Sequence, residues 1–62
     1  MFREYQCVRL RRQVAPMDRG AEGTIVMAYS EPPGYDVEFM DADGKTLALL
    51  TSYDEDLESA EN

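Results

Sequence analysis

Cys7 is the side chain best suited to nucleophilic chemistry, and the chain contains no second cysteine and no histidine. A catalytic thiol needs a neighbouring base, and the usual zinc sites and the Ser-His-Asp triad need histidine or several cysteines. We therefore predict no enzymatic activity, no catalytic residue, no metal site and no cofactor. Cys7 is interpreted as a small apolar residue at the end of a strand.

Asp41, Asp43 and Gly44 have the residue types of a calcium-binding loop but not its spacing. An EF-hand spreads its ligands over a loop of about twelve residues with a glycine near the middle. Here the glycine directly follows Asp43, and Lys45 adds a cation beside it. An Asp-Gly pair between two apolar segments instead predicts a tight β-hairpin, because glycine adopts positive φ readily.

The elements that must position these residues are strands. Val8 and Leu10 alternate with Arg9 and Arg11, the period-two pattern of a strand with one solvent-exposed face. Segments rich in glycine and proline separate this stretch from the later apolar ones. The predicted strands cover residues 5–13, 23–29, 35–39 and 45–51, joined by a loop at 14–23 and by turns at 30–34 and 41–44.

The C-terminal segment predicts a different structure. Ser52 and Glu55 have the spacing of a capping box, and Tyr53 and Leu57 lie four residues apart, so one helical turn would place both side chains on the same side. Residues 58–62 have little to bury and are expected to form an acidic frayed tail.

We predict an all-β fold: a small SH3-like barrel of four to five strands with a short C-terminal helical turn. Residues 1–57 would form its single domain. An open sheet would expose one apolar face, whereas a barrel buries that face and removes most of the sheet edge. Because the strand at 5–13 would remain at an edge, the expected state is a monomer or an edge-strand homodimer. The expected core consists of Val8, Leu10, Val26, Val37, Phe39 and Leu49.

Four strings carry a resemblance to a known family. They are, in order, Cys7-Val8-Arg9-Leu10, Gly20-x-x-Gly23-Thr24-Ile25-Val26, Tyr35-Asp36-Val37-Glu38-Phe39 and Asp43-Gly44-Lys45-Thr46. Over nearly its whole length the chain resembles a family of small bacterial proteins catalogued as a domain of unknown function (DUF4926-like). The resemblance implies an SH3-like barrel, and the glycine-containing string also resembles part of a KOW motif. Some members look as though they accompany a second small protein, which suggests an antitoxin-like or immunity-like role.

Charge is unevenly distributed in a chain whose formal charge is −7. Residues 1–19 carry five arginines against two acids, a net of +3, and residues 20–62 carry eleven acids against one lysine, a net of −10. The acids outnumber the bases that could pair with them, which favours an acidic surface that attracts a basic partner. We therefore predict a non-enzymatic protein–protein interaction module that binds a cognate, basic protein partner.

The predicted partner-binding residues are Asp36, Glu38, Tyr53, Asp54, Glu55, Asp56 and Leu57. A simpler interpretation exists for each part of this set. Asp36 and Glu38 could pair across strands with Arg9 and Arg11, and the acidic C-terminal segment could serve only solubility.

Two other functions stay open. A KOW-like nucleic-acid-binding module would use Arg9, Arg11 and Arg12, although the net acidic charge argues against nucleic acid as a ligand. An SH3-like accessory subunit of an enzyme complex is the other. The N-terminal segment lacks the apolar core of a secretory signal, and the longest apolar run, 25–29, is too short to cross a bilayer. We expect a cytoplasmic protein without membrane contact, in agreement with a single unpaired cysteine.

Overall fold

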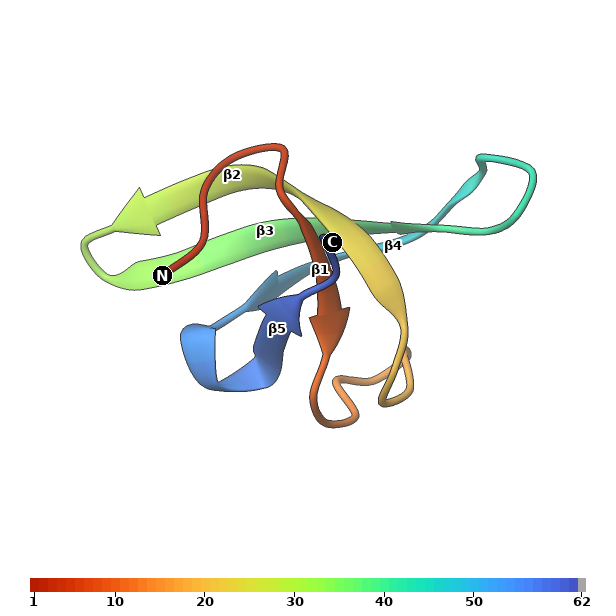
Figure 1. Ribbon diagram of the computed structural model, residues 1–62, viewed down its shortest axis with the longest axis horizontal. Coiled ribbons are helices and arrows are strands. Elements are labelled where there is room, and N and C mark those ends of the chain that lie inside the picture. Colours follow the sequence, from red (N-terminus) through yellow and green to blue (C-terminus); the bar gives the residue numbers. More distant parts are fainter. Residues whose placement is uncertain (62) are drawn as a thin grey trace.

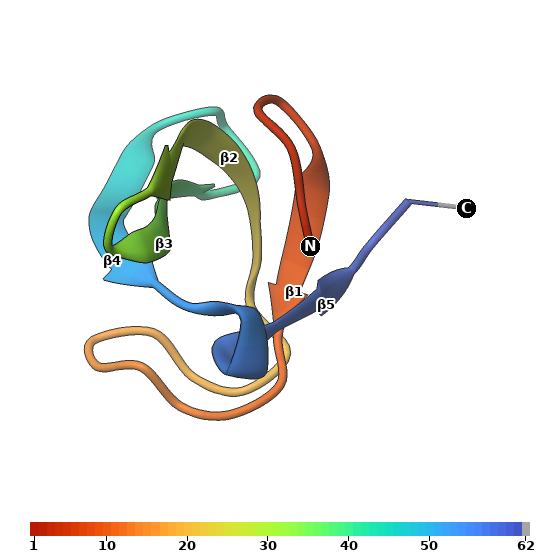
Figure 2. The ribbon, with the colours of Figure 1, turned by 90° about the vertical axis from the view of Figure 1, so that its left-hand side faces the viewer.

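The computed structural model describes residues 1–61, which form one antiparallel sheet of five strands (Figure 1). The elements are β1 (Cys7–Leu10), β2 (Glu22–Ser30), β3 (Pro33–Met40), β4 (Thr46–Ser52), the 3₁₀ turn η1 (Asp54–Asp56) and β5 (Leu57–Ser59). Their order across the sheet is β4-β3-β2-β1-β5. The sheet is strongly curled rather than flat (Figure 2). The predicted all-β class is confirmed.

Two features of β2 let the sheet bend. The register with β3 shifts between Ile25 and Met27, which leaves Val26 in a bulge, and a bulge increases the local twist and bends its strand. At the start of the strand, Gly23 opposes Phe39. A Cβ on Gly23 would lie 2.7 Å from the backbone oxygen of Glu38, so the close approach of β2 and β3 requires glycine here.

The core lies on the inner face of the curled sheet and draws residues from β1, β2, β3 and β5. Its fully buried members alternate along β1 and β3, as the period-two pattern predicts. The core residues are Val8, Leu10, Ile25, Tyr35, Val37, Phe39 and Leu57, with Phe2, Val14, Met17, Ala21 and Leu50 packed against them.

Two predicted core residues are wrong. Val26 is only half-buried, and Leu49 is 59% exposed, whereas the adjacent Ile25 is buried and Leu50 packs against the core. Both errors fall in segments that are apolar at nearly every position. A shift of one residue moves every side chain to the other face, and such segments contain no polar alternation to choose between the faces.

The C-terminal residues form a strand where a frayed tail was expected. β5 pairs with β1 in the register Val8↔Ser59, Arg9↔Glu58 and Leu10↔Leu57, and the backbone N–H of Ala60 donates to the oxygen of Cys7. The domain therefore extends beyond its predicted end at residue 57. The physical reason is that β1 offers an unpaired edge and burial of Leu57 brings the chain to it. Asn62 lies outside the described residues.

Smaller differences concern the ends of other elements. The turn η1 begins one residue later than expected: Tyr53 precedes it, and the carboxylate of Asp56 accepts the N–H of Tyr53 at 3.0 Å. Ser52 instead ends β4 as a buried residue. The first strand covers Cys7–Leu10 rather than residues 5–13. It is flanked by β2 and β5, so it is not an edge.

The hairpin between β3 and β4 is confirmed. The side chain of Asp41 accepts the backbone N–H groups of Asp43 and Lys45, both at 2.9 Å. Gly44 has a φ of 84°, a left-handed conformation that glycine adopts without steric cost. Within residues 1–61 no helix has the length and apolar character needed to cross a membrane.

Candidate interaction surface

The outer face of β2, β3 and β4 carries the predicted acids Asp36 and Glu38. Cross-strand neighbours place Asp36 between Met27 and Thr51, and Glu38 between Thr24 and Leu49. Because side chains alternate between the two faces of a strand, these rows lie on the face opposite the core. We call this surface the acidic–apolar face; it consists of Thr24, Met27, Tyr29, Asp36, Glu38, Met40, Thr46, Leu49 and Thr51, with Leu47 in the bulge beside Thr46.

Large apolar side chains on this face are open to solvent. Leu47 is 55% and Leu49 59% exposed, and Met27, Tyr29 and Met40 are each 44–45% exposed. Single exposed apolar residues are ordinary on protein surfaces. Five on three neighbouring strands make this side of the sheet a candidate contact surface.

Hydroxyl groups hold the two carboxylates in place. Tyr29 and Thr51 both donate to Asp36, the latter at 3.0 Å, and Thr46 donates to Glu38. The carboxylate of Asp36 stabilises the protonated phenol of Tyr29 and so raises the pKa of Tyr29. Within residues 1–61 no ion pair neutralises either acid, and both charges remain available to a cation from outside.

The other predicted partner-binding residues lie at the C-terminal end of β4. Tyr53 is 47% exposed. Asp54 accepts the hydroxyl of Tyr35 at 2.8 Å, and Asp56 pairs with Arg12 at 3.2 Å. Glu55 is exposed. Within residues 1–61 no hydrogen bond or ion pair joins this group to Asp36 or Glu38.

One member of the predicted set is wrong as a surface residue. Leu57 is 2% exposed and belongs to the core. It could not contact a partner without leaving its packing against the inner face of the sheet. The four-residue spacing from Tyr53 to Leu57 predicts that both side chains lie on one face of a helix. In the structure the 3₁₀ turn ends at Asp56, and the chain continues from Leu57 as β5, with the Leu57 side chain in the core.

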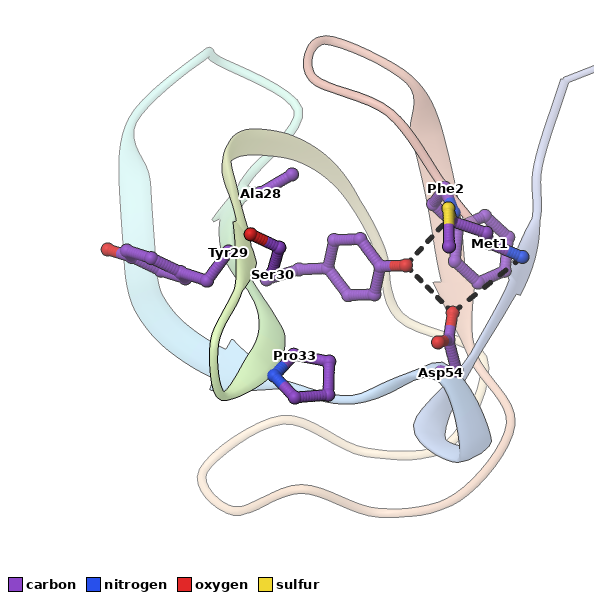
Figure 3. Close-up of a pocket in the computed structure, with 8 residues that line it drawn as sticks. Met1, Phe2, Ala28, Tyr29, Ser30, Pro33 and Asp54 are labelled. Carbon is purple, nitrogen blue, oxygen red and sulfur yellow. Dashed lines mark hydrogen bonds and ion pairs between the residues drawn. The ribbon is translucent and has the colours of Figure 1, made fainter.

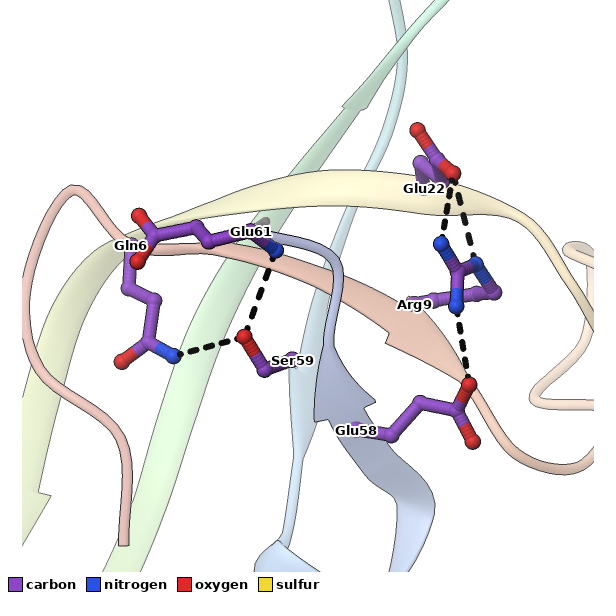
Figure 4. Close-up of polar contacts among 6 residues, drawn as sticks. All are labelled: Gln6, Arg9, Glu22, Glu58, Ser59 and Glu61. Atoms are coloured by element: carbon purple, nitrogen blue, oxygen red, sulfur yellow. Dashed lines mark hydrogen bonds and ion pairs between the residues drawn. The ribbon is translucent and has the colours of Figure 1, made fainter.

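The arginines of the alternative nucleic-acid site are held mainly by acids. Arg9 lies between Glu22 and Glu58, at N–O distances of 3.2 and 2.9 Å (Figure 4). Its guanidinium donates hydrogen bonds to both carboxylates, and these bonds, that to Glu58 most, raise the pKa of Arg9. Arg12 pairs with Asp56. The Arg11 side chain is exposed, without an acid partner in the described part of the chain.

The expected pairing of Arg9 and Arg11 with Asp36 and Glu38 is wrong. β1 and β3 are separated by β2 in the sheet, so cross-strand partners of Arg9 come from β2 and β5 instead. Exposed ion pairs of this kind stabilise a fold only weakly, but they reduce the positive charge that a phosphate backbone would meet.

A pocket of about 240 Å³ lies between the first residues and the end of the β2–β3 hairpin (Figure 3). Its polar groups bond to one another. The hydroxyl of Tyr35 accepts the N–H of Phe2 at 3.0 Å and donates to Asp54, and the terminal ammonium of Met1 lies 3.8 Å from that carboxylate. This arrangement fastens the N-terminal segment over the core. Two causes raise the pKa of Tyr35: burial of the phenol, which has the largest effect, and its hydrogen bond to the Asp54 carboxylate.

Residues 4–59 match the model of a domain of unknown function, DUF4926. Because the match covers most of the chain, the protein belongs to this family. No curated protein and no solved structure matches the chain. The SH3-like barrel that the resemblance implies therefore stays a prediction.

Sequence reasoning found the acids of the acidic–apolar face but missed its apolar residues. None of Met27, Met40 and Leu47 is among the predicted binding residues, and the sequence prediction places Leu49 in the core. The absence of charge from β4 is a signal in the sequence. It could be interpreted only once the structure put β4 at the edge of the sheet.

Proposed function

We propose that the protein is a non-enzymatic protein–protein interaction module whose acidic–apolar face binds a basic partner protein. The observation that supports this most is the 59% exposure of Leu49, which lies directly opposite Glu38 and next to Thr51, the cross-strand neighbour of Asp36; Leu47, two residues away along β4, is 55% exposed. The buried centre of an interface is more apolar than the rest of a protein surface, and complementary charges steer the encounter and help to select the partner.

The net charge of −7 agrees with a basic partner. An antitoxin-like or immunity-like role would be one form of this function, and a cytoplasmic location would suit it. A nucleic-acid ligand is less well supported, because Arg9 and Arg12 are paired with acids of the chain itself.

The test is co-purification from the native host with an affinity tag, at about 0.15 M and about 0.5 M salt. A stoichiometric basic protein, recovered less well at the higher salt, is the expected result. The double variant Asp36→Asn, Glu38→Gln keeps acceptor oxygens for the neighbouring hydroxyls but removes two charges. It should lower recovery of the partner about tenfold, a loss near 1.4 kcal/mol.

The charge-matched control is Glu4→Gln, Glu31→Gln, because both residues are exposed turn residues outside the face. It should retain the partner. Equal loss in both double variants would refute a contact at this face. Recovery of nuclease-sensitive material without protein would instead support the arginine strand as a site, and a large catalytic protein would indicate an accessory subunit. Deletion of the acidic C-terminal segment is not a usable test, since it would remove Leu57 from the core.

A further inference from the structure

β4 is an unprotected edge strand. Within residues 1–61 it pairs with β3 alone, so one row of its backbone N–H and C=O groups is directed away from the sheet. From Ala48 to Ser52 its register with β3 is regular, residue by residue. The bulge near Met40 affects only the first part of the strand.

The two edge strands of the sheet, β4 and β5, differ in how well they are protected against the addition of another strand. Natural edge strands are guarded by shortness, charge or proline, because an open edge accepts further strands. β5 spans three residues and includes Glu58. β4 spans seven residues, Thr-Leu-Ala-Leu-Leu-Thr-Ser, with no charged residue and no proline.

Both sides of β4 are prepared for a neighbouring strand. On the inner side, Ala48 and Leu50 are only half-buried, because the core ends there. On the outer side, Leu49 and Thr51 lie next to Glu38 and Asp36. An added strand would continue the apolar inner layer with one set of side chains and reach the carboxylates with the other.

We infer that β4 binds an extended segment of the basic partner by strand addition, with apolar and basic residues alternating along that segment. This inference rests on the proposed function and specifies how the partner binds. In this mode backbone hydrogen bonds supply affinity and alternate side chains supply specificity. The added strand would lie about 5 Å from β4, so its lysine or arginine side chains, which are long and flexible, would extend over Leu49 and Thr51 toward Asp36 and Glu38.

A second copy of the chain fits this edge less well. Pairing β4 with β4 would bring together two molecules of charge −7. Their Asp36 and Glu38 side chains would lie on the same outer surface, and β4 itself contributes no cation to separate them. A basic segment neutralises these charges, whereas a second copy doubles them.

The experiment uses the isotope-labelled full chain and a capped synthetic peptide of about eight residues in which lysine and valine alternate. Binding is followed by NMR, through chemical shifts and hydrogen exchange of the β4 amides. We expect slower exchange of the outward-facing amides within 46–52. The same peptide, N-methylated at alternate residues, cannot complete the ladder and should bind about tenfold more weakly.

A variant pair tests the position of the site. Leu49→Lys places a cation on β4 opposite Glu38, which guards the edge and also neutralises the face, and should abolish peptide binding. Gln13→Lys adds the same charge in the exposed loop between β1 and β2 and should not, and the N-methylated peptide separates the edge from the face. The amide spectrum of each variant shows whether it remains folded.

Three results would overturn the inference. Equal binding of the two peptides without protection of β4 would indicate a side-chain contact only, and the proposed function would stand. Protection of β4 in the free chain, together with a dimer in sedimentation, would assign the edge to a second copy. Absence of saturable peptide binding would also reject strand addition, while the co-purification experiment would still decide the proposed function independently.

Discussion

At the scale of single residues, Tyr35 has the most consequential polar group. Its ring lies in the core, at 5% exposure, and its hydroxyl joins the N-terminal segment to η1 through Phe2 and Asp54. The Tyr35→Phe substitution keeps the ring but leaves an N–H and a carboxylate without this partner. We expect a loss of about 1–3 kcal/mol in the free energy of unfolding at neutral pH, measured by urea denaturation, with Tyr53→Phe as the exposed control.

The same residue predicts a pH dependence. Because burial raises the pKa of Tyr35 in the folded state, the unfolded chain releases this proton at a lower pH than the folded one. The stabilisation is therefore complete below the unfolded value of about 10 and is lost as the pH rises through the folded value. Unfolding measured across this range should show a shallower decline for Tyr35→Phe than for the wild type. Identical slopes would show that Tyr35 does not titrate differently in the two states.

At Ser52, loss of the hydroxyl is expected to stabilise the fold, in contrast to its loss at Tyr35. It is 0% exposed, and its Oγ has no hydrogen-bond partner within the described residues. A buried hydroxyl without a partner loses its hydrogen bonds to water and gains none in the protein, which destabilises the folded state. Ser52→Ala should therefore raise the free energy of unfolding by about 1 kcal/mol in thermal or urea unfolding. A decrease of that size would mean that the Oγ is bonded in solution.

At the scale of elements, the close approach of the paired strands β2 and β3 depends on Gly23. A Cβ at this position would lie 2.9 Å from side-chain atoms of Phe39 and Val37, in addition to its contact with the backbone of Glu38. Gly23→Ala should cost about 1–3 kcal/mol by overpacking. Thr24→Ala, one residue along the same strand on the outer face, should cost less. Similar losses for both variants would contradict the close approach of the two strands.

Two leucines on different elements test the assignment of inside and outside. Leu57 of β5 is 2% exposed and Leu47 of β4 is 55% exposed. Leu57→Ala should lower the free energy of unfolding by about 2–5 kcal/mol, as expected for a fully buried leucine. Leu47→Ala should change it by no more than about 0.5 kcal/mol. Comparable effects would place both side chains in similar surroundings.

At the scale of the whole molecule, β5 completes the domain. A chain of 62 residues has little stability in reserve, and β5 supplies both Leu57 and the second neighbour of β1. A chain ending at residue 56 should be unfolded by circular dichroism and amide dispersion. A chain ending at residue 59 keeps the strand and should remain folded. A folded chain without β5 would show that the other four strands form a stable sheet without it.

The uneven charge also acts at this scale. The arginines of the first nineteen residues are largely taken up by acids that the fold brings beside β1 and η1, as with Arg9 and Arg12. The acids of the acidic–apolar face are not among these partners. The numbers of acids and bases in the sequence show that some acids must remain without a basic partner. Only the strand order decided which acids these are.

The sequence by itself determined the all-β class, the Asp41–Gly44 hairpin, the inward positions of β1 and β3 and the acidic character of the surface. Each of these depends on short-range rules, namely alternation, turn chemistry and charge count. The tertiary structure alone decided that Ile25 and Leu50 point inward while Leu49 points outward, that residues 57–59 form a strand, and that β4 rather than β1 is the open edge. These outcomes depend on which strands become neighbours, and a uniformly apolar segment contains no local signal of its neighbours.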